Sequence, residues 1–189
     1  MNPRELIDTL SVAEKLKCTL RHCYTSSGRI ESVAEHSWRL ALMALLVSDN
    51  FPEADMNKVI RMCLIHDLGE AFTGDIPTFE KTGAHEEEEF SRLMNWVNSL
   101  PEPYCHSFAD LFKEMADRES LEAKIFKALD NMEAVIQHNE SDIATWLPLE
   151  YDLQLTYGEK NVAFSPYMQK LKAAANADTL QKIEASRSK

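Results

Sequence analysis

Four residues from three segments of the chain have the side chains of a metal centre. His66 and Asp67 are adjacent and lie at the end of an apolar helical pattern. His36 precedes a strongly apolar stripe, and Asp130 interrupts another one. Each of them alone is more often structural, as a capping or core histidine or as a solvated aspartate. Together, two imidazoles and two carboxylates predict a site for one divalent ion of Mn, Fe, Co, Ni or Zn rather than Ca or Mg.

Two further acids follow the His-Asp pair. Glu70 lies about one helical turn after His66, near enough to orient a water molecule or to take its proton. Asp75 follows in a segment that Gly74 and Pro77 mark as a loop. The spacing therefore places additional carboxylates close to the predicted metal.

The segments that carry these residues show helical periodicity. Ser32 and Glu35 fit a capping box at the start of the helix that holds His36. The polar stretch 25–29 indicates an ordered loop, and no segment is convincing as a strand. The pattern predicts an all-α domain of six or seven helices. The predicted helices are residues 3–20, 32–48, 55–70, 83–99, 106–117, 119–139 and 165–184.

Length, glycine content and charge exclude several functions. The 189 residues suit one domain, residues 1–189, better than two. The 5 glycines form neither a GxGxxG nor a GxxxxGK[ST] motif, which excludes Rossmann and P-loop nucleotide binding. A net charge of −11 argues against nucleic acid as a partner, because an acidic chain repels its phosphates.

The sequence also predicts where the protein works. No apolar run approaches the roughly 20 residues of a membrane span, and the first residues do not resemble a signal peptide. The 4 cysteines contain no CxxC pair and are expected to be reduced thiols. We therefore expect a soluble, cytoplasmic protein without a membrane partner.

The H…HD…D pattern in a helical domain resembles that of the HD phosphohydrolase superfamily. Two longer stretches, Glu31-Ser-Val-Ala-Glu-His36-Ser and His66-Asp-Leu-Gly-Glu-Ala-Phe-Thr-Gly-Asp75-Ile-Pro, are similar to one branch of it. That branch contains the bacterial 5′-deoxynucleotidases of the YfbR type and related eukaryotic HD-domain-containing proteins. The resemblance spans roughly residues 5–140 and implies a single HD domain, with C-terminal helices packing on this motif core.

The resemblance implies a role for each matching position. The implied metal ligands are His36, His66, Asp67 and Asp130. Such a four-ligand shell leaves positions on an octahedral ion for a water molecule and a phosphate oxygen. Glu70 and Asp75 match catalytic acids, and Arg21 matches an arginine that contacts the phosphate. A guanidinium suits that role because it can bind two phosphate oxygens at once.

One departure from the family pattern follows Arg21. The bacterial enzymes have a Trp-Pro pair there, with the aromatic ring beside the sugar, whereas this chain has His22 and Cys23. We expect His22 to bind the substrate; a solvent-facing loop histidine is the alternative. The preference between ribose and deoxyribose is open at this stage. The resemblance to this family also implies a homodimer.

The leading hypothesis is a metal-dependent phosphohydrolase, a 5′-nucleotidase that converts deoxyribo- or ribonucleoside 5′-monophosphates to nucleoside and phosphate. A second hypothesis keeps the metal but changes the substrate to a nucleoside triphosphate, a cyclic dinucleotide or an alarmone, which need more cationic side chains than the motifs offer. A third is a non-catalytic nucleotide sensor, against which the presence of Glu70, Asp75 and Arg21 argues.

Overall fold

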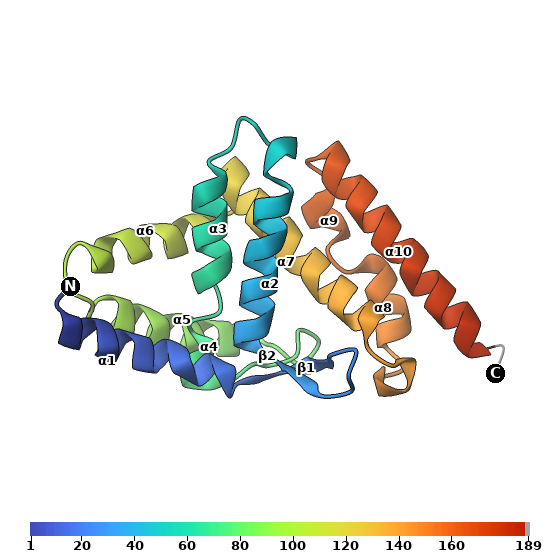
Figure 1. Cartoon of the computed structure of the whole chain (residues 1–189), viewed down its shortest axis with the longest axis horizontal. Helices are drawn as coiled ribbons and strands as arrows, with labels where there is room; N and C mark the ends of the chain where they lie inside the picture. The colour runs from blue at the N-terminus through green and yellow to red at the C-terminus, as the bar shows by residue number, and fades with distance from the viewer. Residues whose placement is uncertain (188–189) are drawn as a thin grey trace.

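Helix α7 (Leu121–Glu140) runs through the centre of the molecule, and elements from both halves of the chain pack on it (Figure 1). The computed structural model describes residues 1–187. Within that range seven α-helices have ten residues or more, as many as the sequence predicts, and three are shorter. The all-α class is therefore confirmed. The other helices are α1 (Pro3–Glu14), α2 (Val33–Leu46), α3 (Met56–Ile65), α4 (Glu70–Thr73), α5 (Gly83–Val97), α6 (Tyr104–Asp117), α8 (Glu150–Thr156), α9 (Glu159–Val162) and α10 (Pro166–Arg187).

Helices α2, α3 and α7 contact one another in all three pairs and form the part of the core that carries the metal-type residues. Their facing side chains are fully buried, among them Leu40, Val59, Met62, Leu129 and Met132. Burying one such side chain contributes about 1.5 to 3 kcal/mol. The relative placement of these three backbones is therefore well determined by packing.

The start of α2 follows the predicted capping box. The Ser32 hydroxyl accepts the backbone N–H of Glu35, and the Glu35 carboxylate accepts the backbone N–H of Ser32. Two donors that the first turn would otherwise leave unpaired are thereby satisfied. This cap fixes the first turn of α2, in which His36 lies.

Residues 20–32 correct the expectation that the chain has no strand. Strands β1 (Leu20–Tyr24) and β2 (Ile30–Ser32) pair antiparallel. The predicted loop is the turn between them, closed by a 2.8 Å hydrogen bond from Thr25 N to Arg29 O, with Gly28 at φ +84°. Strands of five and three residues are too short to show a clear alternation in the sequence. The hairpin matters because β1 contacts α7 and carries Arg21 and His22.

Two predicted helices end earlier than their periodicity indicates. The first ends at Glu14 and is followed by a 3₁₀ turn, Lys15–Lys17, before β1. The third ends at Ile65 instead of residue 70, and hydrogen bonds of the i to i+3 type tighten residues 65–70 into a turn. His66 and Asp67 lie in this turn, so neither side chain has to follow the face of a straight helix.

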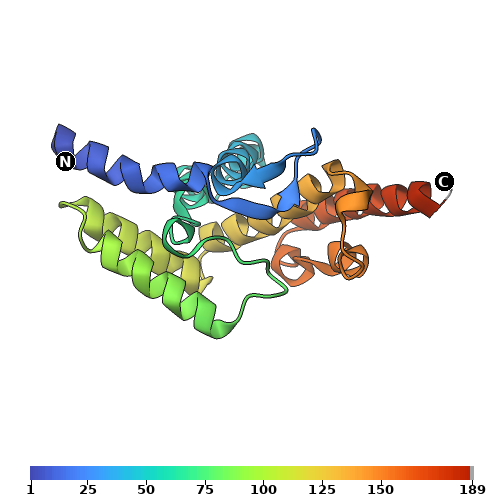
Figure 2. The same cartoon turned by 90° about the horizontal axis from the view of Figure 1, so that it is seen from below.

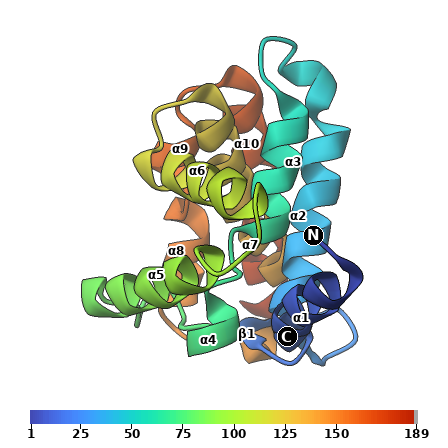
Figure 3. The same ribbon diagram turned by 90° about the vertical axis from the view of Figure 1, so that its left-hand side faces the viewer.

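The C-terminal helices lie beside the central one. Helices α9 and α10 contact α7, and α8 contacts α10. Figure 2 shows α1 and α5 extending to the opposite side of the molecule from α10, and Figure 3 shows α6 beside α3, with which it is in contact, and α5 farther from α2. Among the helices of residues 1–187, none has the length and hydrophobicity that crossing a membrane would need.

Candidate active site

The four metal-type residues converge from α2, from the turn after α3 and from the middle of α7. His36 Nε2 lies 3.2 Å from Asp130 Oδ1 and 3.9 Å from Asp67 Oδ2. His66 Nε2 lies 3.0 Å from Asp67 Oδ2 and 3.6 Å from Asp130 Oδ1. The structure thus brings together two imidazole nitrogens and two carboxylates that are up to 94 residues apart in the sequence.

These residues fit a divalent cation. His36, His66 and Asp67 each offer one ligand atom, and these atoms all lie within 4.8 Å of one another. The buried Nε2 of His66 forms no hydrogen bond with any group of residues 1–187, although two carboxylates are near it. A buried polar atom without a partner is costly, and coordination of a cation would satisfy it. Imidazole and carboxylate together suit a divalent transition metal.

The charges of the cluster are strongly coupled. Burial opposes protonation of His66, but the charges of Asp67 and Asp130 outweigh it and raise its pKa to about 10. Burial by itself would raise the pKa of Asp67, yet His66 and His36 bring it below its ordinary value. A bound cation would take over this role of the imidazolium, so metal binding would release protons from the histidines.

Glu70 and Asp75 lie beside this cluster. Glu70, the first residue of α4, is 6% exposed; burial, then the charges of Asp67, Asp75 and Glu89, raises its pKa to about 10. Burial also raises the pKa of Asp75, whose carboxylate accepts the backbone N–H of His22 at 3.3 Å. The charge of a cation in the cluster would lower both pKa values again. Both groups line a cavity next to the metal-type cluster.

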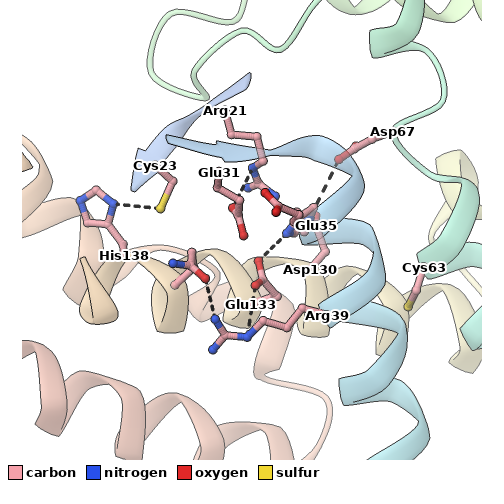
Figure 4. A network of polar contacts seen from close by, with 12 residues as sticks. Arg21, Cys23, Glu31, Glu35, Arg39, Cys63, Asp67, Asp130, Glu133 and His138 are labelled. Carbon is pink, nitrogen blue, oxygen red and sulfur yellow. Dashed lines mark hydrogen bonds and ion pairs between the residues drawn. The ribbon is translucent and has the colours of Figure 1, made fainter. Parts of the chain in front are cut away.

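Arg21 places a positive charge on β1 opposite these acids. Its Nε lies 3.7 Å from Glu31 Oε2, and its buried Nη1 has no hydrogen-bond acceptor among residues 1–187 (Figure 4). Burial would lower the pKa of Arg21, but the carboxylates around it, with Glu133 and Asp67 foremost, raise it instead. A charged donor that lacks an acceptor at the edge of a cavity is suited to an anion.

A cavity of about 250 Å³ joins these groups. Seven of the eight predicted site residues line it, namely Arg21, His22, His36, Asp67, Glu70, Asp75 and Asp130. His66 is absent from that lining and borders a second, adjoining cavity, which it shares with Asp67. The sequence therefore identified residues that the fold does bring together, while their individual roles stay predictions.

Comparison with known proteins gives the family. A family model described as HD domain matches residues 13–172. The chain belongs to the HD domain family. It is 31% identical over 142 residues to the human protein named 5′-deoxynucleotidase HDDC2, a match that covers 72% of this chain and 68% of the relative. It is 28% identical over 144 residues to the Dictyostelium discoideum protein of the same name, covering 71% and 76%.

A solved structure shares the fold of this HD domain. A protein from Magnetospirillum magnetotacticum, described as a predicted metal-dependent phosphohydrolase, superposes with a TM-score of 0.77 at 27% sequence identity. The similarity covers 95% of this chain and 93% of that one. The Pyrococcus furiosus protein described as a conserved hypothetical protein is 32% identical, with a TM-score of 0.56 and 69% of this chain covered.

Four further residues of this HD domain lie near the predicted ones and were not predicted, and three of them, Lys127, His138 and Glu150, line the cavity. Lys127 donates a 2.6 Å hydrogen bond to Asp130 Oδ2, and the buried Glu133 contacts Nδ1 of His36. Both lie one turn from Asp130 on α7, but periodicity alone does not show that they face the cluster. His138 and Glu150 have no local signal either, because only packing brings them together, with His138 Nε2 3.4 Å from Glu150 Oε2.

The ring of His22 lies beside Glu150, which also contacts His138, rather than at the metal cluster. Its Nε2 is 3.3 Å from Glu150 Oε1, and its ring packs edge-on against Phe79 with centroids 5.3 Å apart. Next to it, Cys23 Sγ lies 3.7 Å from His138 Nδ1 (Figure 4). The ring of His22 is thus held between an aromatic ring and a carboxylate, and it faces the cavity.

Proposed function

We propose that this HD domain is a metal-dependent phosphomonoesterase that hydrolyses nucleoside 5′-monophosphates to nucleoside and phosphate. One observation carries the proposal: three of the four metal-type residues, a buried guanidinium with an unsatisfied N–H and two acids all line one cavity, and the fourth, His66, borders the cavity next to it. The names of the human and Dictyostelium discoideum relatives, 5′-deoxynucleotidases, support the nucleotide as substrate. Deoxyribonucleotides are accordingly the substrates that we expect first.

The predicted ligands His36, His66, Asp67 and Asp130 would hold the cation. When bound, it would supply Lewis-acid polarisation of the phosphoryl group and acidify a water molecule. Arg21 would bind the non-bridging phosphate oxygens through its free N–H and offset the charge that accumulates as the P–O5′ bond breaks. The Lys127 ammonium holds the second oxygen of Asp130, which leaves Oδ1 turned toward the histidines.

Hydrolysis also moves protons. The attacking water must lose one, and the leaving 5′-oxygen must gain one. Glu70 and Asp75 are the carboxyl groups of the cavity lining close enough to Asp67 for its charge to raise their pKa. We assign the proton transfers to this pair, with both residues as catalytic.

The charges of the cavity favour a substrate with one phosphoryl group. Three lysine or arginine side chains line it within residues 1–187, and all three have a carboxylate partner, but only the two lysines are at hydrogen-bond distance from theirs. Lys81 Nζ lies 2.7 Å from Glu89, and Lys127 Nζ lies 2.6 Å from Asp130. Arg21 alone of the three has an unsatisfied buried N–H in the described chain, which suits a monophosphate better than a triphosphate.

The test is phosphate release from a panel of ribo- and deoxyribonucleoside mono-, di- and triphosphates. Metal-stripped protein is supplied with Co²⁺, Mn²⁺, Ni²⁺, Zn²⁺ or Mg²⁺, with Asp67→Ala and Glu70→Ala as controls. We expect metal-dependent release from 5′-monophosphates that both substitutions abolish. Release from triphosphates alone would replace the proposed substrate class. No release with any metal, together with retained nucleotide binding, would favour a sensor.

We further propose that the protein is a homodimer. The outer face of α2 exposes four large apolar side chains, with Trp38 64% and Leu46 73% exposed, and Leu42 and Leu45 beside them. Contiguous apolar surface of this kind marks an interaction site in many proteins. Sedimentation equilibrium should give a dimer for the wild type and a monomer for Leu46→Glu; a wild-type monomer would contradict the proposal. The cytoplasmic location stays a prediction from the sequence.

A further inference from the structure

The buried carboxylate of Glu133 has no role in the predicted ligand set. Glu133 lies one turn after Asp130 on α7, is 0% exposed and contacts Nδ1 of His36, which is 1% exposed. The other ring nitrogen of His36, Nε2, faces Asp130 Oδ1 at 3.2 Å. Glu133 therefore touches the predicted ligand His36 from the side opposite the metal cluster.

We propose that Glu133 is a positioning residue that holds His36 with Nε2 turned toward the metal site. A carboxylate accepts hydrogen bonds, so the ring nitrogen that faces it carries the hydrogen. In a neutral imidazole the opposite nitrogen then keeps the free electron pair that a cation requires. Histidine ligands are commonly oriented in this way, and the carboxylate also makes the ring a stronger donor to the metal.

His66 provides a comparison within the same cluster. Its Nδ1 lies 3.0 Å from the backbone carbonyl oxygen of Cys63, which also only accepts hydrogen bonds. Both rings therefore present Nε2 to Asp67 and Asp130. The difference is that the partner of His66 is a neutral main-chain group, whereas the partner of His36 is a charged side chain that a substitution can remove.

The carboxylate of Glu133 is itself held by a cation. Arg39 Nε lies 3.6 Å from Glu133 Oε1 (Figure 4), and the guanidinium is fixed by hydrogen bonds to Gln137 at 2.6 Å and to Glu140 at 2.7 Å. This arrangement joins the first turns of α2 to the second half of α7. It adds a polar link between the two helices that carry His36 and Asp130.

The same carboxylate belongs to a second group of possible ligands, and the neighbouring charges argue against a second cation there. Ligand atoms of Glu31, His36 and Glu133 lie within 4.8 Å of one another. Arg21 lies 3.7 Å from Glu31, and Arg39 lies 3.6 Å from Glu133. Two guanidinium groups thus already compensate the two carboxylates. The geometry therefore favours support of His36 over binding of another metal.

Titration of Co²⁺ into metal-free protein tests the inference, which rests on the proposed metal site. Glu133→Gln keeps the size and one acceptor oxygen but removes the charge, and we expect it to weaken Co²⁺ binding by about 10- to 100-fold. His36→Ala should weaken it further, because a ligand is lost. Glu122→Gln is the matched control: it makes the same change near the start of the same helix, where the carboxylate contacts Lys58 and the backbone N–H of Asp55, so it should bind Co²⁺ like the wild type.

The outcomes separate the positioning role from the metal site. Wild-type Co²⁺ affinity in Glu133→Gln, with lost affinity in His36→Ala, would overturn the role of Glu133 and leave the metal site in place. Wild-type affinity in both variants would overturn the metal site itself. A lowered melting temperature of metal-free Glu133→Gln with unchanged Co²⁺ affinity would show that Glu133 is structural only, and would also overturn the proposal.

A second measurement does not depend on whether a variant folds. In Zn²⁺-loaded wild-type protein, a long-range ¹H–¹⁵N NMR spectrum reports which ring nitrogen of His36 carries a hydrogen. The proposal requires the hydrogen on Nδ1, facing Glu133, and none on Nε2. The opposite tautomer would overturn it.

Discussion

The two ends of the cavity are built in different ways, although helix α7 contributes to both. At the metal end, each of three predicted ligands has a fixed partner behind it: Cys63 O for His66, Glu133 for His36 and Lys127 for Asp130. At the other end, one carboxylate serves two rings, since Glu150 lies 3.3 Å from His22 and 3.4 Å from His138. These contacts are longer than those at the metal end.

The difference matches what the proposed reaction would require of each end. Chemistry at phosphorus needs ligands held within a fraction of an ångström, which requires that each be oriented by a second group. Contact with a sugar or a base tolerates more adjustment, because its energy is spread over several weak interactions. Substitutions at the metal end should therefore abolish the reaction, whereas substitutions at the other end should change which nucleotide is bound and how tightly.

Asp130→Asn is the strongest test of this contrast. It removes the charge of a predicted ligand and leaves the Lys127 ammonium facing a neutral amide. Loss of a group that merely orients a ligand costs about 10- to 100-fold in metal affinity or activity, so loss of the ligand itself should cost at least about 100-fold in phosphate release. Co²⁺ titration and phosphate release measured on one preparation check this. Near wild-type release would remove Asp130 from the ligand set.

Arg21→Lys should have the next largest effect. Lysine keeps the charge but cannot bind two phosphate oxygens with parallel N–H groups. We expect kcat/KM for a nucleoside 5′-monophosphate to decrease by about 100-fold, the lower end of the roughly 100- to 1,000-fold loss found when one donor to a developing negative charge is removed, because lysine keeps the charge. Competitive inhibition by inorganic phosphate should weaken in parallel, while Co²⁺ affinity stays at the wild-type value. Weakened Co²⁺ binding would instead assign Arg21 to the support of the cluster.

Residues of the metal end could be predicted from the sequence because their polar side chains lie within or next to apolar helical patterns. Asp130 interrupts an apolar run on a core helix, and a carboxylate beside a buried stripe is costly unless it is paired or coordinates a metal. Glu133 lies in the same run and was missed, because periodicity does not distinguish a charged side chain that faces a buried histidine from one that faces solvent. The 0% exposure of Glu133 is a property of the packed helices α2 and α7.

The other end was predicted only in part, for a physical reason. His22 was singled out by its position after Arg21, but the strand that carries both residues was not recognised in so short a hairpin. Glu150 and His138 are separated from His22 by more than 100 residues, and their proximity follows from the packing of α8 and β1 around α7. Local patterns do not contain that information.

Glu150→Gln tests the other end with a smaller expected effect. The amide oxygen can still accept the backbone N–H of Leu147, so the start of α8 should persist, but the charge beside His22 is lost. Because hydrogen bonds to charged groups contribute about 1.5 to 3 kcal/mol and this contact is long, we expect KM to increase severalfold with little change in kcat. Asp152→Asn, on the exposed side of α8, is the control. A fall in kcat with unchanged KM would place Glu150 in the chemistry.

The smallest expected effect concerns Lys172, through which helix α10 supports the end of the cavity that contains His22 and Glu150. Lys172 on α10 is 5% exposed, donates to the backbone carbonyl of Gln154 at 2.8 Å, and Gln154 lines the cavity. Burial lowers the pKa of Lys172 from 10.5 to about 8, against the opposing charge of Glu159. Between these two pH values the unfolded chain binds more protons at this lysine than the folded chain does. The contribution of Lys172 to stability therefore increases as the pH rises from about 8 toward 10.5.

Lys172→Met removes this titration. Urea unfolding of both proteins is measured at pH values on either side of the folded pKa. The stability of the wild type relative to the variant should increase by about 1 kcal/mol as the pH increases, less than the full shift would give because these measurements cover only part of the interval between the two pKa values. The difference between the two proteins is the quantity to follow, since other groups titrate in both. Parallel pH profiles would mean that Lys172 keeps its ordinary pKa in the folded state. Phosphate release near neutral pH should change little, because no described residue of α10 lines the cavity, so the loss of this contact affects the end that contains His22 through Gln154 and leaves the metal end intact.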